Sequence, residues 1–266
     1  MANSGLNFVQ LADGSASATP LILIHDGGGT VLSYKALGSL DRDVYGISNP
    51  RFDNGQPWEG GIPEMARSYT QMIKARIPKG DLLLGGWSFG GYLAMEISHN
   101  LANDDDLRIV GLIMIDSPYP KIMDGNLRDA INSQLPDLIG IRPDMRRKIH
   151  SSIKHARVML STWQPPKWDS DALDQDMVEE RPPPPVTLLR SIEPVTRRSG
   201  KVEPVGVVDI FRHDPLLGWN QFRQGFIQVA WNIPGNHYTI FGTQNVPIVT
   251  EKIASACAYL CGSAAA

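Results

Sequence analysis

The sequence predicts an α/β fold: a doubly wound, mostly parallel sheet with a helical lid inserted between two strands. Short apolar runs alternate with segments of helical periodicity over the first 115 residues, which is typical of parallel strands joined by helices. A long helical stretch then follows, and the strand pattern resumes only at residue 186. We therefore expect a single domain over residues 1–266, with the lid at about 120–185.

The predicted elements follow one another in the order that such a sheet requires. Continuous apolar runs predict buried strands, and they lie at Thr19–Ile24, Asp43–Ile47, Asp81–Gly85, Leu107–Ile115, Val186–Arg190 and Gly225–Trp231. Apolar residues at helical spacing predict helices over 62–77, 91–100 and 246–260. In the lid, residues 127–138 and 144–163 have the clearest helical pattern, and four prolines at 182–185 form an extended connector.

Composition and charge are those of an ordinary globular protein. Of the 266 residues, 42% are hydrophobic and 20% are charged, and the net charge is −3. This charge gives no reason to expect nucleic acid or an anionic membrane as a partner. No apolar run approaches the roughly 20 residues of a membrane-spanning helix. The first residues lack the features of a signal peptide.

The two cysteines, Cys257 and Cys261, lie four residues apart on a predicted helix. This spacing places them on one helical face, where we expect them to pack as small apolar groups rather than form a disulfide. Cysteine usage of this kind is typical of a reducing compartment, and we expect a cytoplasmic location.

The segment Gly86–Gly90 is the most informative in the chain. Its sequence, Gly-Trp-Ser-Phe-Gly, lies between a predicted strand and a predicted helix, which is the pattern of a nucleophile elbow. In so sharp a turn, a side chain at either glycine would strike the neighbouring strand or helix. The turn raises Ser88 to the end of the sheet, beside helix amides that favour a developing oxyanion. Ser88 is therefore the predicted nucleophile.

A serine hydroxyl needs a base, and the chain has six histidines. His237 follows the last predicted strand, on a loop that lies next to the elbow in a doubly wound sheet, and it comes after the serine and the acid in the chain. His237 is therefore the predicted base. Four of the other five histidines are explained differently: His25 closes an early strand, His99 points away from the strand ends, and His150 and His155 belong to the lid.

Two aspartates are candidates for the acid that orients this base. Asp116 ends the strand that follows the elbow helix, whereas Asp214 comes directly after His213, beyond the strand that follows the lid. Either carboxylate can hold an imidazole in the required tautomer. Aspartates at strand ends also cap turns. Topology alone leaves both candidates open.

The predicted oxyanion hole takes one amide from each of two loops. Phe89 follows the nucleophile, so its amide is the first donor. The second is assigned to Gly27, because the loop His25–Gly29 is rich in glycine and its backbone can approach closely. This loop lacks the lysine of a P-loop and the spacing of a dinucleotide fingerprint, so nucleotide binding is not expected. No metal site is predicted.

Several of these segments together resemble a known family. They are Leu21–Gly29 with Ser33 and Tyr34, Gly86–Gly91, Ile115–Pro118 and Gly235–Tyr238. They are similar to the thioesterase domains that end polyketide synthases and non-ribosomal peptide synthetases, those of fungi above all, within the α/β-hydrolase superfamily. The resemblance runs from about residue 20 to residue 260 and is weakest in the insertion. In that family the acid follows the strand after the elbow, which implies Asp116.

The resemblance also implies an activity. Ser88 would take an acyl chain from the phosphopantetheine arm of an acyl carrier or peptidyl carrier protein. His237 would act as base and then acid, Asp116 would orient it, and Gly27 and Phe89 would bind the oxyanion. Release would be by hydrolysis or by intramolecular cyclisation, and the enzyme would need no cofactor of its own.

Three questions stay open at the level of sequence. The basic residues Arg146, Arg147, Lys148 and Lys154 of the lid form either a face for an acidic carrier protein or a solvated helix face. A free-standing carboxylesterase acting on small esters would use the same triad. A hydrolase-fold binding protein with a vestigial triad is the alternative of a different class.

Overall fold

A seven-stranded sheet forms the centre of the computed structural model, which describes residues 6–12, 18–120, 135–136, 138, 140–168, 182–195 and 207–263. Its strands are β1 (Leu6–Gln10), β2 (Leu21–Ile24), β3 (Val44–Ile47), β4 (Gly80–Trp87), β5 (Leu107–Ile115), β6 (Val186–Ser191) and β7 (Ile227–Ile233). Their order across the sheet is β1-β3-β2-β4-β5-β6-β7. The pair β1 and β3 is antiparallel, and every other neighbouring pair is parallel.

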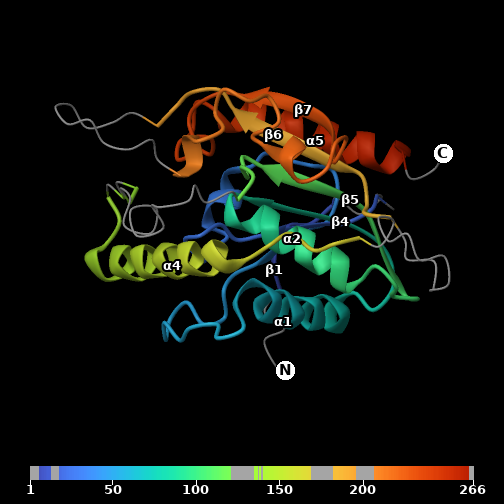
Figure 1. Ribbon diagram of the computed structural model, residues 1–266, viewed down its shortest axis with the longest axis horizontal. Coiled ribbons are helices and arrows are strands. Elements are labelled where there is room, and N and C mark those ends of the chain that lie inside the picture. The colour runs from blue at the N-terminus through green and yellow to red at the C-terminus, as the bar shows by residue number, and fades with distance from the viewer. Residues whose placement is uncertain are drawn as a thin grey trace.

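Helices cover both faces of this sheet (Figure 1). The α-helices are α1 (Gly61–Arg76), α2 (Phe89–Asn100), α4 (Pro143–Thr162) and α5 (Val246–Ser263). The short 3₁₀ helices are η1 (Leu32–Ala36), η3 (Val207–Asp209) and η4 (Trp219–Gln221). Helices α1, α2 and α4 lie on one side of the sheet, and α5 lies on the other (Figure 1).

The two halves of the core follow from the alternation of side chains along a strand. In β2, Ile22 and Ile24 pack with the residues of α1 and α2, whereas Leu21 and Leu23 pack with those of α5. All four side chains are completely buried. A strand buried on both faces therefore reads as a continuous apolar run, which is why β2 was predictable.

Most predicted elements are present, and the predicted class of a mostly parallel α/β sheet is confirmed. The strand β1 was not predicted, and β7 begins at Ile227 rather than at Gly225, which adopts a φ of 75° in the preceding turn. Helix α4 agrees with the pattern at 144–163, whereas the helix predicted over 127–138 lies outside the described residues. The expected packing of the cysteines is confirmed: Cys257, on α5, is buried in the core, Cys261 packs against the same cluster, and both are free thiols.

Among the described helices, none has the length and apolarity to cross a membrane.

Candidate active site

Ser88 lies at the turn between β4 and α2, in a backbone conformation that few residues adopt. Its φ is 55° and its ψ is −113°, a strained combination for a residue with a side chain. A Cβ at Gly86 would overlap the backbone of Gly90, and a Cβ at Gly90 would overlap the carbonyl of Ile24. The close contact of strand and helix therefore requires glycine on both sides of the serine, as the sequence pattern predicted.

Asp116 and His237 are brought together at the carboxyl ends of the strands. The Nδ1 atom of His237 lies 2.8 Å from Oδ2 of Asp116, and the two side chains are 3% and 0% exposed. The amide of Ser88 donates a hydrogen bond to the carbonyl of Ile115 at 2.8 Å, which places the elbow beside the end of β5. The ring of Trp87, the residue before the serine, lies 5.7 Å from the ring of His237. The three residues predicted from sequence thus come from one edge of the sheet.

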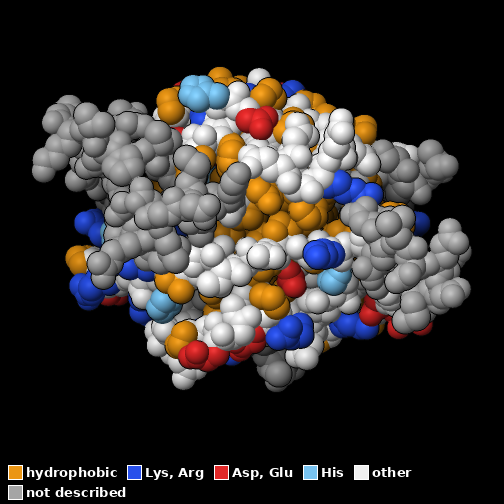
Figure 2. Space-filling view, in the orientation of Figure 1, with side chains coloured by type: hydrophobic (Ala, Val, Ile, Leu, Met, Phe, Trp, Pro, Cys, Tyr) orange, Lys and Arg blue, Asp and Glu red, His pale blue; other side chains and the backbone are white. Residues whose placement is uncertain are grey.

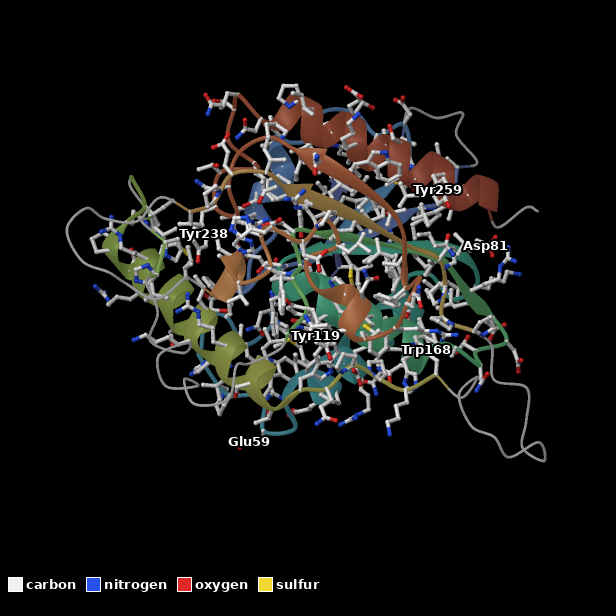
Figure 3. All side chains as sticks on the ribbon, turned by 45° about the horizontal axis from the view of Figure 1, so that its top comes forward. Glu59, Asp81, Tyr119, Trp168, Tyr238 and Tyr259 are labelled. Atoms are coloured by element: carbon white, nitrogen blue, oxygen red, sulfur yellow. The ribbon has the colours of Figure 1, made fainter. Side chains whose placement is uncertain are left out.

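This edge is opposite the end at which β4 begins. In Figure 3, Tyr238, the neighbour of His237, and Asp81, near the start of β4, lie at opposite ends of the sheet. Parallel strands bring all their carboxyl ends to one edge, and loops from that edge form the binding sites of such sheets.

Arg212 is a feature of this site that the sequence analysis did not predict. Its side chain is 4% exposed, and its guanidinium makes a two-pronged (forked) contact with the Asp116 carboxylate, with Nη1 2.6 Å from Oδ1 and Nη2 2.9 Å from Oδ2. The amide of Ser191 also donates to Oδ1, at 2.8 Å. Burial by itself would raise the pKa of Asp116, but the hydrogen bonds and charges of His237 and Arg212 outweigh it and lower the pKa to about 2. The carboxylate is therefore held ionised.

Asp214, the other candidate acid, has a different role. Its carboxylate accepts hydrogen bonds from the amides of Leu216 at 2.9 Å and Gly218 at 3.0 Å, so it caps the turn that leads into η4. The preceding His213 is exposed. The geometry therefore favours Asp116 over Asp214 as the partner of His237.

The predicted oxyanion residues lie in a common cavity. Phe89 is the first residue of α2, so its amide has no acceptor within the helix. Gly27 and Phe89 both line a cavity of about 230 Å³, which extends beneath α4 towards the loop of residues 49–58. Neither Ser88 nor His237 is among its lining residues.

His25 stands at the base of the glycine-rich loop and is buried. Its Nδ1 donates to the carbonyl of Asp26 at 2.5 Å, which leaves Nε2 to accept from the Tyr69 hydroxyl at 2.7 Å. Burial lowers the pKa of His25 to about 4, against which the hydrogen bond to Asp26 acts weakly. His25 is therefore a neutral side chain that shapes the loop.

Helix α4 lies directly over the glycine-rich loop His25–Gly29. A Cβ at Gly27 would be 3.6 Å from that of Ala156, an ordinary contact, so the helix packs against the glycine. At the far end of α4, the indole of Trp163 donates to Glu96 Oε2 on α2 at 2.8 Å. On its other flank, Arg157 hydrogen-bonds Tyr238, the neighbour of His237. The helix therefore contacts the loops that carry both the predicted base and the predicted oxyanion amide.

Within the part of the chain that the structure describes, no group of three or more His, Cys, Asp and Glu side chains is arranged to hold a metal ion.

Comparison with known proteins identifies the family. The model of the thioesterase domain family matches residues 19–257, which is most of the chain. The chain belongs to the thioesterase domain family. The resemblance seen in its motifs is thereby confirmed, and this thioesterase has relatives of similar length among fungal proteins.

Two such relatives illustrate the similarity. The probable thioesterase gloN of Glarea lozoyensis is 36% identical over 266 residues, which cover 94% of this chain and 92% of the relative. The thioesterase frbD of a Dothideomycetidae species is 37% identical over 255 residues, covering 95% and 94%. Among solved structures, the NocB thioesterase domain in covalent complex with a fluorophosphonate nocardicin G analogue has a TM-score of 0.69 and 22% identity, over 94% of this chain and 98% of that one. This structural likeness supports the same fold.

Proposed function

We propose that this thioesterase transfers an acyl chain from the phosphopantetheine thiol of an acyl carrier or peptidyl carrier protein to Ser88, and then releases it. The observation that carries the proposal is the buried 2.8 Å contact between His237 Nδ1 and Asp116 Oδ2 at the strand ends where the Ser88 elbow lies. A hydrogen-bonded acid and imidazole next to a serine on a strained turn is the arrangement that activates a hydroxyl for acyl transfer.

The proposed reaction has two halves. In the first, the Ser88 oxygen attacks the thioester carbonyl while His237 takes the hydroxyl proton, and the amides of Gly27 and Phe89 stabilise the oxyanion. Collapse of this intermediate breaks the carbon–sulfur bond, and His237 gives the proton to the departing thiolate. In the second, water or a nucleophile of the acyl chain itself attacks the acyl-serine carbonyl while His237 takes its proton. The ester bond to Ser88 then breaks, His237 returns the proton to the Ser88 oxygen, and the product is a free acid or a ring. Asp116 stays ionised throughout and stabilises the imidazolium.

We infer that residues 1–266 form a single domain in which the segment at about 120–185 is a lid. The contacts of α4 with the glycine-rich loop and with Tyr238 support this role, because a helix in that position controls access to both the oxyanion amides and the base. The reaction needs no bound cofactor, and we expect it to take place in the cytoplasm.

The exposed basic residues of α4 are the surface we assign to the carrier protein. Figure 2 shows Lys and Arg side chains at the end of the molecule that α4 forms. Arg146, Arg147 and Lys154 are exposed there, whereas Lys148 is paired with Asp53 at 2.7 Å. Arg146, Arg147 and Lys154 therefore remain available to an acidic carrier protein. Lys148 contributes less to the attraction of the carrier protein, because its charge is already paired.

The test is to follow a panel of acyl thioesters and matched oxygen esters by mass spectrometry, with the wild type and Ser88→Ala. We expect Ser88-dependent turnover with a preference for thioesters, and the product, acid or ring, identifies the mode of release. A preference for oxygen esters would indicate a carboxylesterase instead.

A second measurement addresses the nucleophile directly. Because the NocB domain forms a covalent complex with a fluorophosphonate analogue, we expect a fluorophosphonate probe to label this chain at Ser88 and not to label Ser88→Ala. An unlabelled Ser88 together with no turnover of either ester class would indicate a binding protein.

A further inference from the structure

The carboxylate of Asp116 is held by more than the proposed base. Its two oxygens receive hydrogen bonds from Arg212 Nη1 at 2.6 Å, Arg212 Nη2 at 2.9 Å, the Ser191 amide at 2.8 Å and His237 Nδ1 at 2.8 Å. A two-pronged guanidinium contact fixes the plane of a carboxylate as well as its position. Asp116 itself has a φ of 48°, and its amide donates a hydrogen bond to the carbonyl of Leu189 on β6 at 2.7 Å, which fixes the backbone but not the plane of the carboxylate.

Arg212 is in turn immobilised by contacts that do not involve Asp116. Its Nε donates to Asp209 Oδ1 at 3.0 Å, while Nη1 and Nη2 donate to the carbonyls of Ser191 and Val208, each at 2.9 Å. Asp209 is 8% exposed, and its second oxygen accepts from the Val195 amide at 2.7 Å. Each guanidinium nitrogen therefore has an acceptor, and the fork is rigid before any substrate binds.

The charges of this cluster have a direct consequence for the imidazole. A buried arginine beside the acid would by itself oppose the protonation of His237, because it cancels the negative charge that stabilises an imidazolium. Asp209 adds a second negative charge on the far side of the guanidinium. With Asp116 and Asp209 ionised and Arg212 protonated, the cluster has a net charge of −1, the same as a lone aspartate.

We propose that Arg212 is a positioning residue that holds the Asp116 carboxylate in line with His237, and that Asp209 offsets its charge so that the imidazolium is still stabilised. The role rests on the proposed function, because it requires His237 to be the base. Asp209 and Arg212 act through Asp116 and do not touch the reacting atoms.

Other charged and titratable groups surround the same imidazole and are left unchanged by the variants below. The ring of Tyr238 lies 5.1 Å from that of His237, and Arg157 on α4 and Asp26 on the glycine-rich loop act on Tyr238. Tyr92 on α2 interacts with the charge of Asp116, and Arg190 on β6 donates to the Arg212 carbonyl at 2.7 Å. Any shift that follows a change at position 209 or 212 is therefore measured against a constant background.

The experiment compares the pH dependence of kcat/KM for Arg212→Gln, Arg212→Lys and Asp209→Asn with that of the wild type, since its acidic limb reports the imidazole of the free enzyme. Loss of the positive charge in Arg212→Gln is expected to move that limb to higher pH by about one unit, with kcat reduced about 10- to 100-fold. Loss of the negative charge in Asp209→Asn is expected to move the limb to lower pH. Arg212→Lys keeps the charge but not the fork, so kcat falls while the limb stays in place.

The matched control is Arg108→Gln. Arg108 also forks a carboxylate, that of Asp81, at 2.8 and 2.6 Å, but on the surface at the opposite end of the sheet. We expect the acidic limb of kcat/KM and the kcat of Arg108→Gln to equal those of the wild type. Opposite shifts in Arg212→Gln and Asp209→Asn support the proposal. The proposal would be overturned if the acidic limbs of these two variants shift in the same direction. It would also be overturned if both variants lose activity while their acidic limbs stay in place, which would indicate a purely structural role.

Two further outcomes are separated in the same assay. Turnover that persists in Ser88→Ala would refute the proposed function itself, whereas Ser88-dependent turnover with unshifted limbs refutes only the role of Arg212. If Arg212→Gln does not fold, Asp209→Asn and Arg212→Lys still distinguish the two roles, because they differ in whether the charge of the cluster changes.

Discussion

The Tyr34 hydroxyl accepts a hydrogen bond from the Trp87 amide at 2.9 Å and donates one to the Ile24 carbonyl at 2.7 Å. The side chain of Tyr34 is 1% exposed. It therefore ties the end of β2, from which the glycine-rich loop starts, to the end of β4, from which Ser88 follows. This buried hydroxyl thus adds a link between the two predicted halves of the oxyanion hole, beyond the pairing of Ile24 with Gly86 in the sheet.

We expect Tyr34→Phe to weaken both the fold and the site. The change leaves two buried backbone groups without this partner, which costs about 1–3 kcal/mol of unfolding free energy. Because one of the links between the strand that leads into the loop of Gly27 and the elbow is lost, kcat should also fall, by roughly 10-fold. Urea unfolding and thioester turnover measure the two effects. Tyr259→Phe, at an exposed position on α5, is the control, and equal behaviour of the two variants would contradict the role of Tyr34.

Gly91 is packed against Ser117, so these two positions should be energetically coupled. A Cβ at Gly91 would lie 2.8 Å from that of Ser117 and closer still to its hydroxyl. Gly91→Ala is therefore expected to lower the unfolding free energy by about 1–3 kcal/mol. Ser117→Gly removes the obstructing atoms, so the double variant should lose less than the sum of the single changes, with a coupling of about 1 kcal/mol or more. Strictly additive losses in urea unfolding would show that the helix relieves the clash elsewhere.

The two candidate acids are expected to differ sharply in activity. Asp116→Asn should reduce kcat on the order of 10⁴-fold, because the amide cannot hold His237 in the required tautomer. Asp214→Asn should keep kcat within a few-fold of the wild type and lose about 1 kcal/mol of stability, because only a turn cap is weakened. Steady-state kinetics of both variants provide the test. Similar losses at the two positions would contradict the assignment of Asp116.

His25 is expected to make stability fall in mild acid. Burial lowers its pKa to about 4, below the ordinary value of 6.5. Between these values the unfolded chain binds a proton that the folded protein does not. The contribution of neutral His25 to the free energy of unfolding is therefore complete above pH 6.5 and is lost as the pH falls towards 4. The drop in Tm over this range should therefore be smaller in His25→Gln, which can still accept from Tyr69, than in the wild type. An unchanged slope would mean that His25 is protonated in the folded state.

Local steric rules explain which parts of the fold were predictable. The elbow requires glycine at positions 86 and 90 because strand and helix approach each other within five residues. This steric constraint involves mostly neighbouring residues, so the local sequence is enough to reveal it. The strand β1 carries no comparable signal, since only Leu6 of its five residues is buried. Its strand character comes from antiparallel pairing with β3, a partner some 40 positions further along the chain.

The choice between the two candidate acids also depends on contacts that the local sequence does not show. In the sequence Asp116 and Asp214 both come after predicted strands, and their surroundings are equally compatible with capping a turn. The structure favours Asp116, whose carboxylate faces His237, while that of Asp214 turns back to the amides of its own loop. Only the resemblance to a family separated the two candidates beforehand.

The sequence by itself determined the class of fold and the glycine-bounded turn at Ser88, because strand periodicity and the tight contact of a strand with the following helix are properties of neighbouring residues. It also predicted the base, His237, from its place in the chain order. The tertiary structure alone decided that Arg212 and Asp209 flank the acid. Arg212 and Asp116 are 96 positions apart in the chain, and an arginine beside a histidine in a loop has no local pattern. A buried charge cluster is created when distant segments meet in a water-excluded place, so its members are recognisable only after folding.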